Sequence, residues 1–199
     1  MKTFVVESVF AGHPLPDGWP EQLTALLGAK PRRMGEWAQM ALYGALSCVE
    51  RARDKSLLRA AGQLVLLSRR GTKTATTHAL AEMQEGLPMP LTFLQTQPSQ
   101  LLASLVNVMG WQGGAVFLGG ADPVQALWLV SAQIPEGGAV LLGVAEVEEG
   151  GRSDWLLLRA KRLDDDAFGE IALDDVLQSR VSCLSISAKG LRGDHVCSD

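Results

Sequence analysis

The chain has 199 residues, of which 47% are hydrophobic and 20% are charged. This length suffices for one well-buried core but is short for two full catalytic domains. The 18 Lys and Arg residues are outnumbered by 22 Asp and Glu residues, which gives a net charge of −4 and a sequence pI of about 5.4. A protein that holds a phosphate backbone carries a basic excess, so we expect no nucleic acid as a partner. The mean hydropathy of +0.11 is high for a soluble chain and indicates apolar surface that is buried against something.

Membrane insertion and secretion do not fit the sequence. No stretch reaches the roughly 18–20 uninterrupted apolar residues that span a bilayer. A short apolar run near the N-terminus resembles a signal peptide, but Glu7 lies inside it and the pattern fits a strand better. The three cysteines, Cys48, Cys183 and Cys197, are odd in number and lack metal-ligand spacing. We therefore expect a cytoplasmic protein with reduced thiols and no membrane span.

The first half of the chain predicts alternating strands and helices. A strand over residues 3–11 leads into a Pro- and Gly-rich loop over residues 12–22. Helical spacing over residues 36–52 predicts a buried helix, in which Cys48 is expected to be a core thiol. The apolar run 64–67 predicts a strand covered on both faces. Helices are then predicted over residues 72–85 and 98–109, the second ending at Gly110.

The stretch from residue 110 to 150 carries the clearest pattern. It predicts a buried strand over residues 115–118, a turn of Gly119, Gly120 and Ala121, a helix capped by Asp122, and a second buried strand over residues 139–145. The inward face of that helix is expected to hold Val124, Leu127, Trp128, Ser131 and Ile134. This unit favours an α/β fold with a mainly parallel mixed sheet and helices on its faces.

The remaining segments complete a single predicted domain over residues 1–199. A strand is expected over residues 155–164, a short helix over 168–177, a last strand over 180–188 and a frayed tail over 190–199. No repeat, low-complexity segment or linker divides the chain.

Several chemical signatures are missing. The sequence has neither GxxxxGK[ST] nor GxGxxG, and RRGTKT at residues 69–74 fits a solvated turn better than a phosphate loop. The histidines His13, His78 and His195 are isolated, and the acidic run at 164–170 is typical of a solvated loop. We therefore expect no metal and no cofactor.

The strand–turn–helix at residues 115–131 has the form of a nucleophile elbow. Such an elbow presents a Ser or Cys at a helix N-terminus, where the helix dipole favours an anionic nucleophile. Here its apex is Gly119, Gly120 and Ala121, followed by Asp122. An ordinary turn between a strand and a capped helix explains the same residues and stays open as the alternative.

The order of these segments resembles the N-terminal half of β-ketoacyl synthases, which have the thiolase-like fold. Four segments carry the resemblance: a buried strand ending in SRRG, the run PLTFLQTQPSQ at 90–100, the elbow with its helix, and GGAVLLGVAEV at 137–147 with Gly143 and Glu146 of a Gly-x-x-Glu pattern. The resemblance covers roughly residues 2–150 and implies a half of the thiolase-like fold. It places Gly120 where condensing enzymes carry the acyl-accepting Cys.

The departures from that family decide the implied function. With Gly120 in place of the nucleophile, and without the second half that supplies two His, or a His and an Asn, condensation by this chain alone is not expected. The resemblance implies a shortened chain-length-factor subunit in a heterodimer with a full-length ketosynthase of type II polyketide or aryl-polyene-type biosynthesis. The residues expected at the shared interface or acyl tunnel are Phe93, Gln95, Gln97, Trp111, Ala115, Val116, Phe117 and Leu118.

Two other functions stay open. One is a homodimeric pseudo-ketosynthase that binds acyl groups or an acyl carrier protein, and the other is an acyltransferase that uses Cys48, Cys183 or a Ser. Carrier proteins are strongly acidic, so a chain of net charge −4 is a poor docking surface for one. We therefore expect the carrier protein to dock on the catalytic partner.

Overall fold

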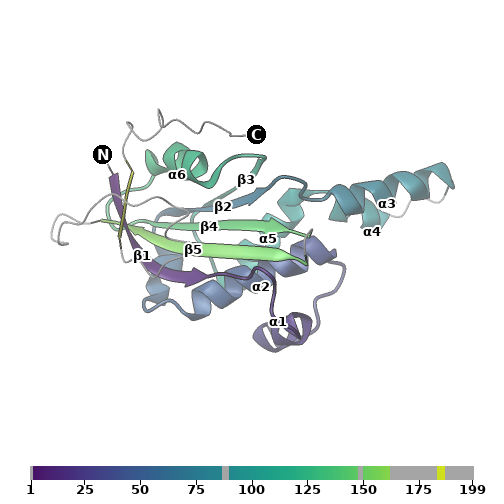
Figure 1. The fold of residues 1–199 in the computed structure, drawn as a ribbon, viewed down its shortest axis with the longest axis horizontal. Coiled ribbons are helices and arrows are strands. Elements are labelled where there is room, and N and C mark those ends of the chain that lie inside the picture. Colours follow the sequence, from purple (N-terminus) through teal and green to yellow (C-terminus); the bar gives the residue numbers. More distant parts are fainter. Residues whose placement is uncertain (1, 87–89, 148–149, 162–182, 187–199) are drawn as a thin grey trace, which may run out of the picture.

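The structure is a computed structural model that describes residues 2–86, 90–147, 150–161 and 183–186 (Figure 1). Its strands are β1 (Lys2–Phe10), β2 (Gly62–Ser68), β3 (Gly114–Gly119), β4 (Ala139–Glu146), β5 (Arg152–Ala160) and β6 (Cys183–Ile186). Its helices are α1 (Trp19–Leu27), α2 (Glu36–Glu50), α3 (Lys73–Gln84), α4 (Pro90–Gln95), α5 (Pro98–Met109) and α6 (Pro123–Ser131), with a 3-10 helix at Lys55–Arg59.

The strands form one mixed sheet in the order β3-β2-β4-β5-β1-β6. β2 pairs in parallel with β3 and β4, whereas β5 is antiparallel to β4 and β1, and β6 is antiparallel to β1. Strands β1 to β4 therefore run in one direction and β5 and β6 run in the other. This confirms the predicted α/β fold with a mixed sheet, in which three of the five strand pairs are antiparallel, and it brings the carboxyl ends of β2, β3 and β4 to one edge.

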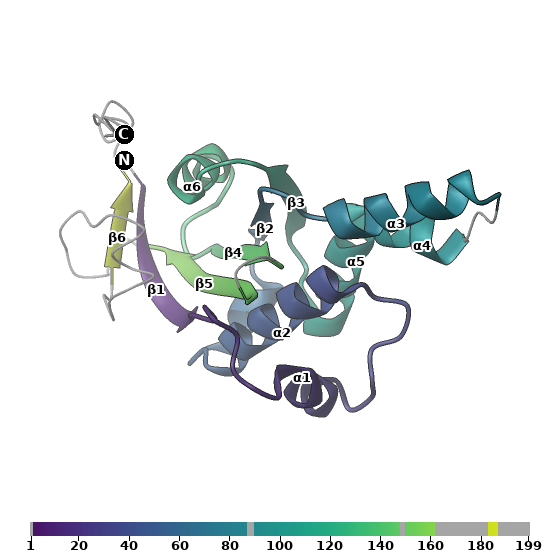
Figure 2. The same ribbon diagram turned by 45° about the vertical axis from the view of Figure 1, so that its right-hand side comes forward.

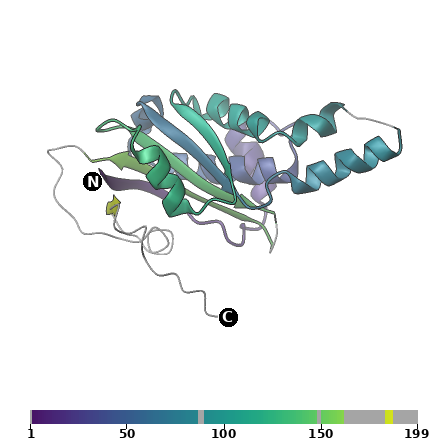
Figure 3. The same ribbon diagram turned by 90° about the horizontal axis from the view of Figure 1, so that it is seen from above.

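Successive side chains along the strands pack alternately into two separate cores, one on each face of the sheet. Helices α2 and α5 cover one face of the sheet, and α6 packs on the other (Figures 2 and 3). On β2 the side chains of Leu64 and Leu66 join the α2 core, whereas those of Val65 and Leu67 join the α6 core. This period of two is the signature of a sheet that is covered on both faces.

A bulge in β1 changes which of its side chains face each core. Phe4 pairs with Ala160 and Val6 with Leu158, but the register then shifts so that Ser8 pairs with Leu157. The extra residue is Glu7, whose carboxylate accepts a hydrogen bond from Arg159 Nε at 2.7 Å. Because of the shift, Phe4 faces the α6 core and Phe10 faces the α2 core.

Two helices lie where the sequence predicted none. Helix α1 begins at Trp19, inside the predicted loop over residues 12–22, with Pro20 in its first turn and Gly18 and Gly28 in the left-handed conformation at its ends. Helix α4 follows Pro90 and has only six residues. The other predicted helices of the described residues are confirmed, and α5 spans Pro98–Met109 as expected.

The predicted inward face of α6 was partly wrong. The buried residues of α6 are Ala126, Leu127 and Val130, with Ile134 just after it. Trp128 and Leu129 instead point away from the sheet, with 46% and 55% of their surface exposed. The helix therefore presents an apolar outer side.

The predicted buried strand over residues 115–118 is an edge strand. β3 pairs with β2 on one side, and within the described residues no strand pairs with its other side. Ala115 is exposed, and Val116, Phe117 and Leu118 are half-buried. An apolar edge of this kind presents unpaired backbone groups to a partner strand.

Helices α3 and α4 form an arm that projects beyond the sheet (Figures 1 and 3). Neither helix has a buried residue. The large apolar residues exposed on the arm are Leu80, Met83, Leu91, Phe93 and Leu94. We call α3 and α4 together the helical arm.

Some predictions lie outside the described residues. These are the helix at 168–177, the tail at 190–199, the acidic run at 164–170, His195 and Cys197. Within the part of the chain that the structure describes, none of the helices combines the length and apolar character needed to cross a membrane.

Candidate functional site

The elbow between β3 and α6 has a defined backbone geometry. Gly120 is in the left-handed conformation with φ of 70°, and its N–H donates to the carbonyl oxygen of Ser68 at 2.9 Å. Asp122 then caps α6 by accepting hydrogen bonds from Val124 N at 2.8 Å and Gln125 N at 3.3 Å. The predicted capped helix start is thereby confirmed.

The apex of the elbow has room for a side chain but carries none. A Cβ atom placed on Gly120 would have no neighbouring atom within 4 Å. Gly120, Ala121 and Asp122 line a pocket of about 540 Å³, which we call the elbow pocket. No atom of Gly120 or Ala121 can act as a covalent nucleophile, and Asp122 Oδ1 is engaged in capping α6. The elbow therefore has no nucleophile at its apex.

Glu146 ties the ends of β2 and β4 together beside the elbow. One carboxylate oxygen accepts from Ser68 Oγ at 3.0 Å, and the other accepts a short hydrogen bond from Arg69 N. Ser68 Oγ also accepts from Gly71 N at 2.6 Å, which closes the SRRG turn. The two predicted motifs, SRRG and Gly-x-x-Glu, are thus brought into direct contact.

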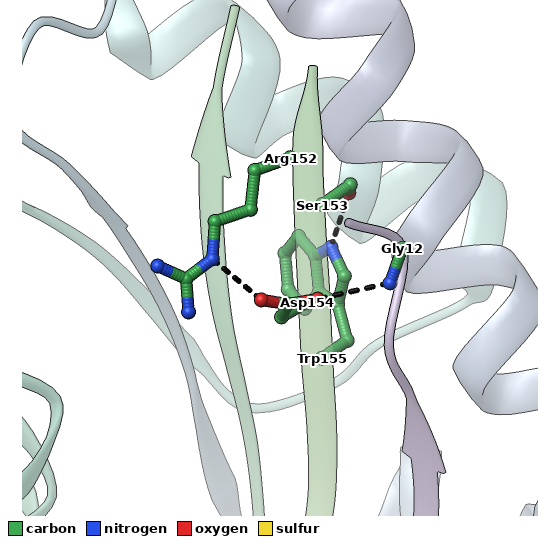
Figure 4. Close-up of polar contacts among 5 residues, drawn as sticks. All are labelled: Gly12, Arg152, Ser153, Asp154 and Trp155. Carbon is green, nitrogen blue, oxygen red and sulfur yellow. Dashed lines mark hydrogen bonds and ion pairs between the residues drawn. The ribbon is translucent and has the colours of Figure 1, made fainter. Parts of the chain in front are cut away.

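Arg152, at the start of β5, lines the elbow pocket from its other side. Its Nε donates to Asp154 Oδ2 at 2.5 Å, and Asp154 Oδ1 accepts from Gly12 N at 2.9 Å (Figure 4). Asp154 is buried, so both of its oxygens are satisfied by the chain itself. The neighbouring Ser153 points to the opposite face, where its Oγ donates to Met40 O and accepts from Trp155 Nε1.

The predicted interface residues of β3 divide between the two faces of the edge strand. Phe117 packs on Trp37 of α2 with the ring centroids 5.9 Å apart, whereas Val116 and Leu118 lie beside the α6 core. Trp111 is only 3% exposed, and its indole N–H donates to Gly114 O at 3.1 Å. Trp111 therefore belongs to the core of this chain, and its side chain cannot reach a partner.

Gln95 and Gln97 line a second pocket of about 560 Å³ between the helical arm and the N-terminal end of α2. Leu91, Leu94 and Leu101 give it an apolar wall. Phe93 does not line this pocket and is 60% exposed on the arm. We call this cavity the arm pocket. The structure thus separates the predicted tunnel residues: two glutamines lie in a cavity and Phe93 lies on an open surface.

Cys48 is not placed to act as a nucleophile. Its thiol is buried beneath β1, 3.6 Å from Trp155 O and 3.7 Å from Ser8 O. Burial raises the pKa of the thiol from its ordinary value of 9.0 to about 11, despite the opposing hydrogen bond with Ser8. The predicted core role of Cys48 is confirmed, which removes it from the acyltransferase alternative. Cys183 lies in β6, and Cys197 lies outside the described residues.

Among the described residues, no group of three or more His, Cys, Asp or Glu side chains is arranged to hold a metal ion. His13 lines the elbow pocket and His78 lines the arm pocket, so these two histidines lie at different sites.

Sequence reasoning missed the charged residues around the elbow. Arg69 and Arg70 were interpreted as part of a solvated turn, yet both line the elbow pocket. Their position directly after a buried strand was a usable signal, because the carboxyl ends of parallel strands meet at one edge. Arg152 and Asp154 also carried a signal, since residues two apart on a strand share one face.

Comparison with known proteins gives a likeness in structure alone. No protein-family model and no curated protein sequence matches the chain. A chain of the ketosynthase (ApeO) in complex with its chain length factor (ApeC) from Xenorhabdus doucetiae is similar, with a TM-score of 0.55 and 18% identity over 80% of this chain and 79% of that one. The two chains therefore have about the same length.

Two further complexes contain similar chains. One is the ishigamide ketosynthase/chain length factor, with a TM-score of 0.54 and 12% identity. The other is AntDE:AntF, a type II PKS acyl-carrier protein in complex with its ketosynthase bound to the hexaketide, with a TM-score of 0.59 and 12% identity. In each case 80% of this chain aligns, and the aligned part spans 58% of the other chain. The chain thus has the thiolase-like fold found in ketosynthase and chain-length-factor complexes.

Proposed function

We propose that the chain is a non-catalytic, chain-length-factor-like subunit that pairs with a full-length ketosynthase in type II polyketide or aryl-polyene-type biosynthesis. The observation that carries this proposal is the elbow, which keeps its turn and its capped helix but has Gly120 at the apex. Without a nucleophile the chain cannot accept an acyl group there. A scaffold that retains an active-site geometry without its reactive group fits a partner role.

The exposed apolar surfaces of the chain support an obligate interface. The β3 edge, the outer side of α6 and the helical arm all present apolar residues that the described part of the chain leaves uncovered. Obligate interfaces are more apolar than the rest of a protein surface and resemble a core cut in half. A ketosynthase seated along β3 would cover this edge and extend the sheet.

The arm pocket is the proposed contribution to the acyl tunnel. Its leucine wall suits an alkyl or polyene chain, and Gln95 and Gln97 would close one end of it. The volume left between these side chains would limit how far a growing chain extends. Phe93, exposed on the same arm, is proposed to contact the ketosynthase rather than the acyl chain.

The charge of the chain bears on the carrier protein. With a net charge of −4 the subunit offers little attraction to an acidic carrier. We propose that the carrier docks on the ketosynthase and that this chain contributes shape. Because the proposed interface is mainly apolar, association of the two subunits should change little with salt concentration.

The test is co-expression of the tagged full chain with each full-length ketosynthase of its source genome. The expected result is co-purification of a 1:1 complex, whose mass is read by light scattering at 0.1 M and 0.5 M NaCl. Reconstitution with carrier protein and extender units should then give products whose length changes in the Gln97→Leu variant. A stable homodimer that binds no ketosynthase would overturn the proposal and favour the homodimeric binding module.

A further inference from the structure

The elbow pocket contains a set of cationic side chains that the proposed function does not use. It lies where β2, β3 and β4 end and is separate from the arm pocket. Polar and charged residues dominate its lining: His13, Ser68, Arg69, Arg70, Asp122, Glu146 and Arg152. The lining thus suits a hydrophilic ligand rather than an acyl chain.

The carboxylates around the pocket are engaged by the chain itself. Glu146 accepts from Ser68 Oγ and Arg69 N, and Asp122 accepts from two N–H groups at the start of α6. Asp154 lies behind the pocket lining and accepts from Gly12 N and Arg152 Nε. Hydrogen bonds to neutral donors spread the charge of Glu146 and Asp122, so these groups oppose a bound anion less than free carboxylates would.

Arg152 is held in place for a ligand. Asp154 engages only its Nε, and the two terminal guanidinium nitrogens extend away from Asp154 (Figure 4). A guanidinium fork whose position is fixed loses little side-chain entropy when it binds a planar or tetrahedral oxyanion. The buried Asp154 is thus a positioning residue for Arg152.

Arg69 follows the carboxyl end of β2, and β4 lies between that strand and β5, which carries Arg152. The backbone N–H of Arg69 is anchored on Glu146, and its exposed side chain makes no hydrogen bond or ion pair within the described part of the chain. Arg70 also lines the pocket but is engaged in an interaction of its own, so Arg69 and Arg152 are the arginines that we consider for a ligand. The cationic groups come from the SRRG turn and from β5, which places them on different sides of one cavity.

From this arrangement we infer that the elbow pocket binds a small hydrophilic molecule through an oxyanion, a phosphate or carboxylate group, held by Arg69 and Arg152. The N–H groups at the start of α6 are used by Asp122, so the contacts to the ligand come from side chains. This inference does not require pairing with a ketosynthase, and either proposal can fail without the other.

The test uses the full chain alone, labelled with ¹⁵N and titrated with inorganic phosphate and, separately, with malonate. Ionic strength is kept constant with NaCl, so that screening alone moves no resonance. The expected result is saturable movement of backbone resonances around residues 69–71, 120–122 and 152. Saturation by phosphate identifies a phosphate-bearing ligand, and saturation by malonate alone identifies a carboxylate; both support the shared oxyanion chemistry.

Variants decide whether the arginines are responsible. Arg69→Gln and Arg152→Gln should each weaken binding at least tenfold, and Asp154→Asn should weaken it by releasing Arg152. Arg59→Gln is the matched control, because Arg59 is exposed in the 3-10 helix and does not line the pocket. If Arg152→Gln unfolds, Arg69→Gln still tests the inference. This substitution should leave the fold intact, because Arg69 bonds to Glu146 through its backbone N–H and not through its side chain. The inference would be overturned if NaCl alone moved the same backbone resonances equally, or if Arg69→Gln bound phosphate and malonate with unchanged affinity.

Discussion

The indole ring of Trp155 lies directly against the α-carbon of Gly143, its cross-strand partner on β4. The same ring meets Gly44 on α2, where a Cβ atom would clash with its Cδ1 and Nε1 atoms. Two glycines from different elements thus make room for the largest fully buried side chain of the α2 core. The Gly of the Gly-x-x-Glu pattern therefore has a packing reason in this chain.

Adding one methyl group at either glycine should destabilise the fold. Gly143→Ala and Gly44→Ala each force an extra carbon against the buried Trp155 ring, and at position 44 also against Ser153 Oγ; such overpacking costs about 1–3 kcal/mol. Urea denaturation measures the loss as a lower midpoint at unchanged slope. Gly119→Ala is the matched control, because a Cβ there makes only an ordinary contact with Phe117, and it should change stability by less than about 0.5 kcal/mol.

The buried thiol of Cys48 should make stability depend on alkaline pH. The unfolded thiol ionises near pH 9.0, whereas burial raises the pKa in the folded chain to about 11. Between these values only the unfolded chain loses the proton, so the stabilisation is complete below about pH 9 and is lost as pH rises toward 11. The expected slope from this group is about 1.4 kcal/mol per pH unit. Comparison of urea midpoints with those of Cys48→Ala, which lacks the titrating group, isolates the contribution.

Thiol chemistry gives an independent measure of the same burial. In a Cys183→Ser and Cys197→Ser background, Cys48 should react with Ellman's reagent only after unfolding. An acyl adduct on Cys48 of the folded chain, detected by intact mass, would contradict the core role assigned to it.

The cap of α6 should contribute measurably to stability. Asp122→Ala removes the side chain that accepts from Val124 N and Gln125 N, and the loss of such a cap costs about 1 kcal/mol. Asp122→Asn keeps an acceptor and should retain most of that stability. Thermal and urea unfolding of the two variants test this, and equal loss in both would show that charge rather than capping matters.

The helical arm should matter for association and not for folding. Phe93→Asp places a charge on a side chain that is 60% exposed, so the isolated chain should keep its stability within about 0.5 kcal/mol. If the proposed function holds, its affinity for the ketosynthase partner should fall at least tenfold, measured by titration calorimetry or pull-down. Leu26→Asp, at an exposed apolar position on α1, is the control and should bind as the unmodified chain does.

Most helices and strands could be predicted from local sequence signals, because residues such as Pro, Gly and Asp fix where a helix begins and ends. The bounds of α5 follow from Pro98 at its start and Gly110 at its end, and the cap of α6 follows from Asp122. Helix α1 was missed because its Pro20 and flanking glycines read as turn residues, although Pro is tolerated in a first helical turn. Pro and Gly residues thus mark the ends of this helix, although the same residues are also typical of turns.

Other features depend on which elements lie next to each other, and the sequence of one segment does not encode that. β3 has the apolar run of a central strand, yet it lies at the edge of the sheet that the described strands form. Trp128 has the character of a core residue, yet α6 turns it outward because Ala126, Leu127 and Val130 face the sheet instead. The arginines of the elbow pocket come from the turn after β2 and from the start of β5, which are about 80 residues apart in the chain, so only the folded sheet brings them together.

The bulge at Glu7 sets a rule for how this chain can change length during evolution. Because Phe4 and Phe10 face opposite cores only by virtue of one additional residue, losing that residue would turn Ser8 and Phe10 toward the wrong layer. Natural insertions and deletions should therefore avoid β1 and accumulate in connections such as residues 29–35, where a change of one residue does not switch side chains from one face of the sheet to the other. The spacing within β1, more than the identity of its side chains, is what descendants of this sequence must preserve.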